Sequence, residues 1–312
     1  MSKPEIKNLP ASILDRLMNQ SQITGRNYNE LLQYYAIERF LYRLAQSAYA
    51  DQFVLKGALL FRVWGLPRYR PTHDIDLLGH TSNNLENMAS IIKDVSAQKV
   101  EDDGMVFDPD TVIAERIKED ADYQGIRVRF NGRLGKARVY IQIDVGFADV
   151  VSPTPKVRIY PVILPMPAPE LRSYPPETVV AEKLQAMIYL AESNSRMKDF
   201  YDLWVLANRF EFNGVVLQES IRRTFEHRKT DIPTAEPVAF SAQFTQKKQG
   251  QWTAFLKTSA ITDAPDQLET ALAFLSAFIL PVFQNTIAKQ KFGKMWKPGG
   301  PWKQDGLLLI RS

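Results

Sequence analysis

The chain has 312 residues, of which 45% are hydrophobic and 24% are charged. These values are typical of a globular protein with a buried core, and they exclude a wholly disordered chain. The 39 Lys and Arg residues exceed the 35 Asp and Glu residues by four, which is compatible with a polyanionic partner. Because the chain has no cysteine, disulfide scaffolds, thiolate metal sites and cysteine nucleophiles are excluded.

The sequence shows no targeting segment. Its N-terminal residues lack the apolar region of a secretory signal. The longest apolar stretch, Ala271–Phe283, is shorter than the roughly 20 residues that cross a bilayer. We therefore expect a cytoplasmic protein with no membrane partner.

The first half of the chain mixes helical and strand periodicity. Apolar spacing predicts helices within the first 50 residues, in KGALLFRVWGL up to Gly65, and over 83–94. The pair Asn131-Gly132 and then Gly135 indicate a hairpin turn, so an antiparallel or mixed sheet is favoured over a βαβ repeat. Apolar runs and period-two alternation predict strands at 53–55, 74–78, 111–117, 126–130 and 137–145.

The second half reads as mostly helical. Eight prolines between residues 152 and 176 surround a strand-like segment, VRIYPVIL, and indicate a domain boundary. The sequence predicts an α/β domain with N-terminal helices over 1–165 and a helical domain with a basic tail over 166–312. Helices are expected at 177–193, 197–209, 214–228 and 265–289.

Two aspartates on the strand at 74–78 are the first candidate site. Side chains alternate along a strand, so Asp74 and Asp76 point to one face while Ile75 faces the core. Two carboxylates about 4 Å apart repel by roughly 4 kcal/mol at an effective dielectric of 20, and a divalent cation removes that cost. The Asp-x-Asp spacings at 108/110 and 120/122 lie in polar surroundings and are expected to be solvated.

A third carboxylate lies in RVYIQIDVGF. Asp144 shares a strand face with Tyr140 and Gln142, and an Asp in so apolar a strand is costly unless it is paired or coordinated. Asp144 is therefore either a metal ligand or a carboxylate at the edge of the sheet in contact with water. Asp149 is a weaker candidate for the same role.

Three further segments carry groups suited to a nucleotide. In Lys56-Gly57-Ala58 a glycine lets the backbone approach a phosphate. Lys183 lies beside the apolar stripe of its helix and can present its ammonium to a cleft, or else extend into solvent. Asp199 and Asp202 share a helix face one turn apart; the alternative for them is the preference of acids for helix N-termini.

In combination these segments resemble the AbiEii/AbiGii-type nucleotidyltransferase toxins, which include the MenT proteins. The resemblance runs from about residue 50 to 210 and includes LKGALLFRVWGLPRYRPTHDIDLL, IQIDV and PPETVVAEKLQA followed by SRMKDFYDLW. It implies a polymerase-β-like nucleotidyltransferase core with a mixed sheet and a helical C-terminal domain. Its characteristic residues include Arg70 before Asp-Ile-Asp.

The resemblance also implies residue roles. Asp74 and Asp76 match the metal-binding pair, and Lys183 matches the lysine that contacts nucleotide phosphates. Asp199 matches the acid of the final motif. The family turn usually reads Gly-Gly or Gly-Ser, whereas Ala58 follows Gly57 here, which removes a hydroxyl but keeps the backbone donors. The implied nucleotide-binding residues are Lys56, Gly57, Ala58, Lys183 and Asp202, and the implied metal ligands are Asp74, Asp76 and, less closely matched, Asp144.

The expected function is Mg²⁺-assisted transfer of NMP from an NTP to RNA, with Mn²⁺ as an alternative ion. The MenT resemblance implies the tRNA 3′ end as acceptor and a helix-turn-helix antitoxin as partner. Modification of a protein or small molecule, and a non-catalytic nucleotide-binding module, are the alternatives. The basic residues expected to bind RNA are Arg222, Arg223, Arg228 and Lys229, and a tail in which Lys289, Lys291, Lys294, Lys297 and Lys303 alternate with Phe292, Trp296 and Trp302.

Overall fold

A computed structural model of the chain describes residues 8–66, 70–120 and 123–304, with side chains outside 118–124. The chain divides into two compact units. The sheet unit comprises Met1–Ala148 and Lys156–Ser173, and the helical unit comprises Asp149–Pro155 and Tyr174–Ser312. The chain therefore passes between units three times. The single boundary expected at 165/166 falls inside the returning segment, which adds two strands to the sheet.

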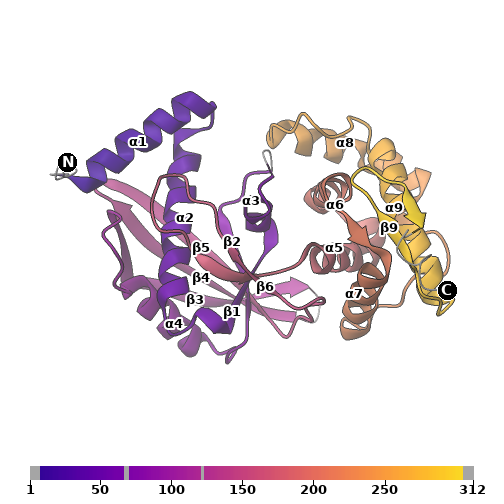
Figure 1. Cartoon of the computed structure of the whole chain (residues 1–312), viewed down its shortest axis with the longest axis horizontal. Coiled ribbons are helices and arrows are strands. Elements are labelled where there is room, and N and C mark those ends of the chain that lie inside the picture. Colours follow the sequence, from indigo (N-terminus) through magenta and orange to yellow (C-terminus); the bar gives the residue numbers. More distant parts are fainter. Residues whose placement is uncertain (1–7, 67–69, 121–122, 305–312) are drawn as a thin grey trace. The chain divides into compact units, whose positions relative to one another are not determined.

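The sheet unit contains a mixed seven-stranded sheet with the order β3-β4-β5-β2-β1-β7-β6 (Figure 1). Strands β5 and β2 are parallel, as are β1 and β7, and the remaining neighbours are antiparallel. This confirms the expected α/β class with a mixed sheet. The strands are β1 (Phe53–Lys56), β2 (Asp74–Gly79), β3 (Met105–Asp120), β4 (Tyr123–Leu134), β5 (Ala137–Phe147), β6 (Lys156–Ile159) and β7 (Glu170–Ser173).

Helices cover one face of this sheet. Alternate residues of β4 and β5, among them Val128, Phe130 and Ile143, are fully or almost fully buried on that face, together with Phe40 of α2. The residues between them on the same strands are exposed or half-buried, so the other face of the sheet is the polar one. The helices are α1 (Leu9–Thr24), α2 (Tyr28–Gln46), α3 (Leu60–Val63) and α4 (Leu85–Ala97).

The helical unit contains five helices and a small three-stranded sheet of order β10-β9-β8 among its described residues. Its core includes the fully buried Trp252 and the almost fully buried Trp296. The elements are α5 (Pro176–Leu190), α6 (Met197–Arg209), β8 (Phe212–Asn213), α7 (Gly214–His227), α8 (Ala242–Thr258), α9 (Leu268–Ile287), β9 (Lys294–Trp296) and β10 (Trp302–Gln304).

Several expected elements differ from the observed ones. The predicted helix ending at Gly65 is only a 3₁₀ turn, Gly57–Leu59, followed by the single turn of α3. The hairpin turn lies at Gly135, where φ is +58°, while Asn131-Gly132 belongs to β4 because Gly132 packs tightly against the Phe107 ring. Helix α8 and the strands of the small sheet were not expected, because their apolar residues lack a sustained period.

Helix α9 is longer than the apolar stretch that marked it in the sequence. It has 20 residues, and among the described helices it is the one long and apolar enough to cross a bilayer. Leu272, Leu275 and Phe278 of this helix are buried within the helical unit. A single helix of this kind, in a packed unit, is weak support for a membrane span.

Candidate active site

Asp74 and Asp76 lie on one face of β2, as the alternation predicts. Ile75 and Leu77 between and beyond them are buried, whereas both aspartates are half-buried. Asp76 is the cross-strand neighbour of Lys56 on β1 and of Asp144 on β5. Since direct cross-strand neighbours point to the same side of a sheet, an ammonium and a third carboxylate share the face of the aspartate pair.

The side chain of Asp76 leaves room only for a glycine at position 57. The glycine has φ of +71°, a conformation that L side chains rarely adopt. A Cβ built at this position would lie 1.9 Å from Oδ2 and 2.7 Å from Cβ of Asp76. Because the clash includes the root of the aspartate, rotating its carboxylate would not relieve it. The turn Lys56-Gly57-Ala58 therefore packs directly on Asp76, as a site combining these residues requires.

Asp144 is held by an arginine that the sequence analysis did not single out. Both carboxylate oxygens accept from Arg127 of β4, from Nε at 2.7 Å and from Nη2 at 2.7 Å. These hydrogen bonds raise the pKa of Arg127 above its ordinary value, against the opposing effect of partial burial. This two-point contact uses one acceptor position on each oxygen and partly compensates the charge that Asp144 could offer a metal ion.

The donor set at Asp74 and Asp76 fits a hard divalent cation. Mg²⁺ is usually bound by one or two carboxylates plus substrate phosphates, and the two aspartates supply such carboxylates beside a close-approach glycine turn. Among the described residues, no group of three His, Asp or Glu side chains is arranged to hold a metal ion. The expectation that Asp144 completes a three-carboxylate site stays a prediction.

Lys183, Asp199 and Asp202 form a cluster within the helical unit. The Lys183 ammonium lies 2.6 Å from Oδ1 of Asp199 and 2.8 Å from Oδ2 of Asp202. The Asp202 side chain is 0% exposed and that of Lys183 is 16% exposed. Buried carboxylates are costly without a partner, so α6 holds the lysine of α5 through two ion pairs. The structure thus groups these three predicted residues, and it groups Lys56, Gly57, Ala58, Asp74 and Asp76 in the sheet unit.

The arginines expected to bind RNA in the helical unit are engaged with acids. Arg222 pairs with Glu219 at 2.8 Å and with Glu226 at 2.6 Å, both on its own helix. Arg223 also pairs with Glu219, and Arg228 lies 3.0 Å from Asp149. These ion pairs reduce the positive charge that Arg222, Arg223 and Arg228 present, and RNA binding by this set, which also includes Lys229, stays a prediction.

The aromatic residues of the tail are part of the core. Phe292 is 2% exposed and Trp296 is 1% exposed, so neither ring can stack on a base. Trp302 stacks on Phe278 at 5.7 Å, and its indole N–H donates to the Phe278 carbonyl. The tail is a packed β-hairpin with lysines on its surface, and the expected aromatic stacking surface is corrected accordingly.

A different set of arginines lies on the polar face of the sheet. Arg127, Arg129 and Arg133 alternate along β4, and Arg138 begins β5 beside Arg133. Their period of two in IRVRFNGR was a usable signal, because it places all the β4 arginines on one face of a strand. From the sequence, that alternation predicts strands, and the shared face of the arginines is a finding of the structure.

Comparison with known proteins assigns the chain to a class. A family model described as the nucleotidyl transferase AbiEii toxin of type IV toxin–antitoxin systems matches residues 39–274, about three quarters of the chain. The chain therefore belongs to the AbiEii nucleotidyltransferase toxin family. This confirms the resemblance drawn from the sequence, and it implies a nucleotide substrate and an antitoxin partner.

Solved structures show more distant likenesses. JHP933 from Helicobacter pylori is 16% identical with a TM-score of 0.47, and the match covers 84% of this chain and 95% of that chain. A second H. pylori protein, described as a nucleotidyltransferase, is 17% identical with a TM-score of 0.45, over 85% of this chain and 99% of that chain. No protein of curated function matches the chain. The family assignment therefore rests on the family model.

Proposed function

We propose that this toxin-type nucleotidyltransferase transfers a nucleoside monophosphate from an NTP to an RNA acceptor, the 3′ end of tRNA, and so blocks translation and growth. The carrying observation is the placement of Asp74 and Asp76 on one half-buried strand face against the Gly57 turn. Family membership supports the transferase class, and the MenT resemblance supports the tRNA acceptor and a helix-turn-helix antitoxin in the cytoplasm.

Asp74 and Asp76 would hold Mg²⁺, or Mn²⁺, together with the phosphates of the NTP. The bound ion would supply positive charge to the oxygens that attack and leave during in-line displacement at the α-phosphorus. The Lys56-Gly57-Ala58 turn, packed on Asp76, would bind the β- and γ-phosphates through its backbone. Each of these contributions is positional and electrostatic, as phosphoryl chemistry requires.

Lys183 would neutralise the leaving pyrophosphate, with Asp199 and Asp202 orienting its ammonium. Asp144 would lower the pKa of the attacking hydroxyl, by metal binding or as a base. The contact with Arg127 makes Asp144 secondary to Asp74 and Asp76 in this proposal.

Incubation of the purified protein with each labelled NTP, Mg²⁺ and total tRNA tests the proposal. We expect label in tRNA with the wild-type protein, and its loss with Asp76→Ala. Asp110→Ala is the matched control, because Asp110 belongs to an exposed Asp-x-Asp pair. Equal transfer by wild type and Asp76→Ala would show that the metal assignment is wrong.

The same assay separates the alternatives. Label in protein or in a small molecule, with none in RNA, would identify a different acceptor. Absence of any Mg²⁺-dependent NTP turnover would favour a nucleotide-binding module without catalysis. Growth arrest on expression that depends on Asp76 would link the activity to toxicity.

A further inference from the structure

The sheet face that carries Asp74 and Asp76 continues across β5 and β4. Gln142 is the cross-strand neighbour of both Asp74 and Arg129, and Arg138 is the neighbour of Arg133. Because neighbours across strands point to one side, these polar side chains form a continuous row with the two aspartates. We call this row the arginine face; it consists of Arg129, Asn131 and Arg133 on β4 and Arg138, Tyr140 and Gln142 on β5.

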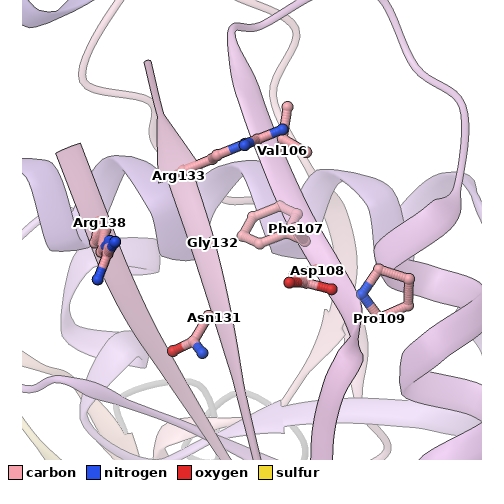
Figure 2. A pocket seen from close by; sticks show the side chains of 8 residues that line it. All are labelled: Val106, Phe107, Asp108, Pro109, Asn131, Gly132, Arg133 and Arg138. Carbon is pink, nitrogen blue, oxygen red and sulfur yellow. The ribbon is translucent and has the colours of Figure 1, made fainter. Parts of the chain in front are cut away.

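The far end of the arginine face is hollowed. A cavity of about 610 Å³ lies there, which is within the usual size range of small-molecule pockets. Figure 2 shows Asn131 and Arg133 along one strand, Arg138 on the strand beside it, and Val106 and Asp108 on the strand opposite. The cavity thus offers two guanidinium groups, one amide, one carboxylate and an apolar contact.

The two cavity arginines differ from the other arginines of the sheet. Arg127 is bound to Asp144, and Arg129 lies 2.7 Å from Glu115. Arg133 and Arg138 are exposed, and neither has a hydrogen bond or ion pair to a side chain in the part of the chain that the structure describes. Two adjacent guanidinium groups without an acid partner are complementary to a phosphate, which they can bind bidentately.

Tyr140 lies between this cavity and the aspartate pair. It is 51% exposed, and the Gln33 side chain donates to its backbone carbonyl at 2.8 Å. Arg138 and Asp144 are six positions apart along β5, so at about 3.3 Å per residue the cavity lies roughly 20 Å from the end of the row at Asp144. That span corresponds to a few nucleotides of a single strand.

We propose that the arginine face binds the single-stranded 3′ segment of an RNA acceptor, with Arg133 and Arg138 holding a phosphate upstream and Tyr140 stacking on a base. A sheet that presents an aromatic ring between cations is suited to unpaired bases, which stack and expose their edges. The inference rests on the proposed function, because it assigns the strand's reactive 3′ hydroxyl to the end of the row at Asp74 and Asp76.

Binding of a fluorescein-labelled, short single-stranded RNA with a free 3′ hydroxyl tests this surface without NTP or metal. Anisotropy titrations at several salt concentrations compare wild type with Arg133→Ala/Arg138→Ala. We expect the double variant to bind at least roughly tenfold more weakly. If one phosphate contact is lost per arginine, the slope of log K against log salt falls by about 1.4.

Matched controls isolate the surface. Arg222→Ala/Arg223→Ala removes two arginines that acids already neutralise, so it should leave RNA binding unchanged. Tyr140→Phe keeps the ring and should keep affinity, whereas Tyr140→Ala should lose about tenfold. All four variants replace side chains with at least partial exposure, and thermal melting verifies that they fold.

The outcomes distinguish this inference from the proposed function. If the wild-type protein binds RNA but transfers no label to it, and the double variant loses that binding, the surface is supported and the proposed acceptor is refuted. Wild-type affinity and salt slope in the double variant would overturn the surface even if transfer to RNA occurs. Equal competition by duplex RNA or by an acidic polypeptide would also overturn it, because the proposal is specific for a single strand.

Discussion

Each unit carries a pair of aspartates on one face of one element, and the two pairs differ in how deeply they are buried. Asp74 and Asp76 follow strand alternation and are half-buried on a polar sheet face. Asp199 and Asp202 lie one helical turn apart, are buried, and both pair with Lys183. Similar sequence patterns thus produce one half-buried pair on a polar sheet face and one buried pair that shares a single lysine.

The arginines repeat this contrast. Arg222 and Arg223 are close in sequence to Glu219 and Glu226, and the helix joins them in ion pairs. Arg133 and Arg138 come from neighbouring strands and are exposed. Local density of charge is therefore a poor measure of a binding surface, because i,i+3 and i,i+4 spacing neutralises charges that appear clustered.

The largest expected effect on stability is at Lys183. Lys183→Met leaves the buried Asp202 carboxylate without its ammonium partner, so the free energy of unfolding should fall by about 3 kcal/mol in urea titrations. Adding Asp202→Asn removes the buried charge and should restore most of that stability. If Lys183 contacts the nucleotide, transfer activity should stay lost in the double variant. Recovery of activity together with stability would make the lysine purely structural.

Gly57→Ala should reduce NMP transfer by roughly 100-fold, because the new Cβ displaces Asp76. Gly25→Ala is the matched control. Gly25 has the same φ of +71° with nothing within 4 Å of an added Cβ, so both variants have the same backbone strain and only one moves the aspartate. Initial rates and melting temperatures are compared. Similar activity in the two variants would contradict the close packing of the turn on the metal-binding pair.

Asp144→Asn should lower the transfer rate by roughly tenfold, against about 1,000-fold for Asp76→Asn, because Arg127 already compensates much of the charge of Asp144. The Mg²⁺ concentration needed for half-maximal rate should change for Asp76→Asn and stay near the wild-type value for Asp144→Asn. Equal shifts in the two variants would assign Asp144 to the metal site.

The smallest effect concerns Glu38, a fully buried acid of α2. Burial raises its pKa to about 7 from 4.5, while Arg39 and the Ile163 amide act in the opposite direction. The folded state therefore binds more protons than the unfolded state between these values, so stability should fall as pH rises from 4.5 to 7. Glu38→Gln should flatten that part of the stability curve in urea titrations, and an unchanged slope would exclude Glu38 as its cause.

Much of the fold could be predicted from the sequence because strong periodicity coincides with the final packing. The strand at β2 and the bounds of α6 were expected within a residue. The helix after Gly57 was overestimated, because its first residues form the 3₁₀ turn Gly57–Leu59 and only Leu60–Val63 are α-helical. Asn131-Gly132 was misread as a turn because a glycine can also serve close packing, as it does against Phe107.

The sequence predicted which candidate residues share a face, and it did not predict the ion pairs that these residues form. Alternation alone placed Asp74 and Asp76 on one face, and helical spacing placed Asp199 and Asp202 together. The partner of Asp144 lies 17 residues away on another strand, so its capture by Arg127 depends on register. Burial of Trp296 likewise depends on tertiary contacts that a basic, Gly-Pro-rich tail does not reveal.

Metal binding by the aspartate pair tests the central claim most directly. Mn²⁺ titrations with a non-hydrolysable NTP analogue, followed by electron paramagnetic resonance, compare wild type, Asp74→Asn/Asp76→Asn and the exposed control Asp110→Asn. The account predicts a nucleotide-dependent Mn²⁺ site in wild type and the control, weakened by more than about tenfold in the double variant. Unchanged Mn²⁺ affinity in a folded double variant would contradict it.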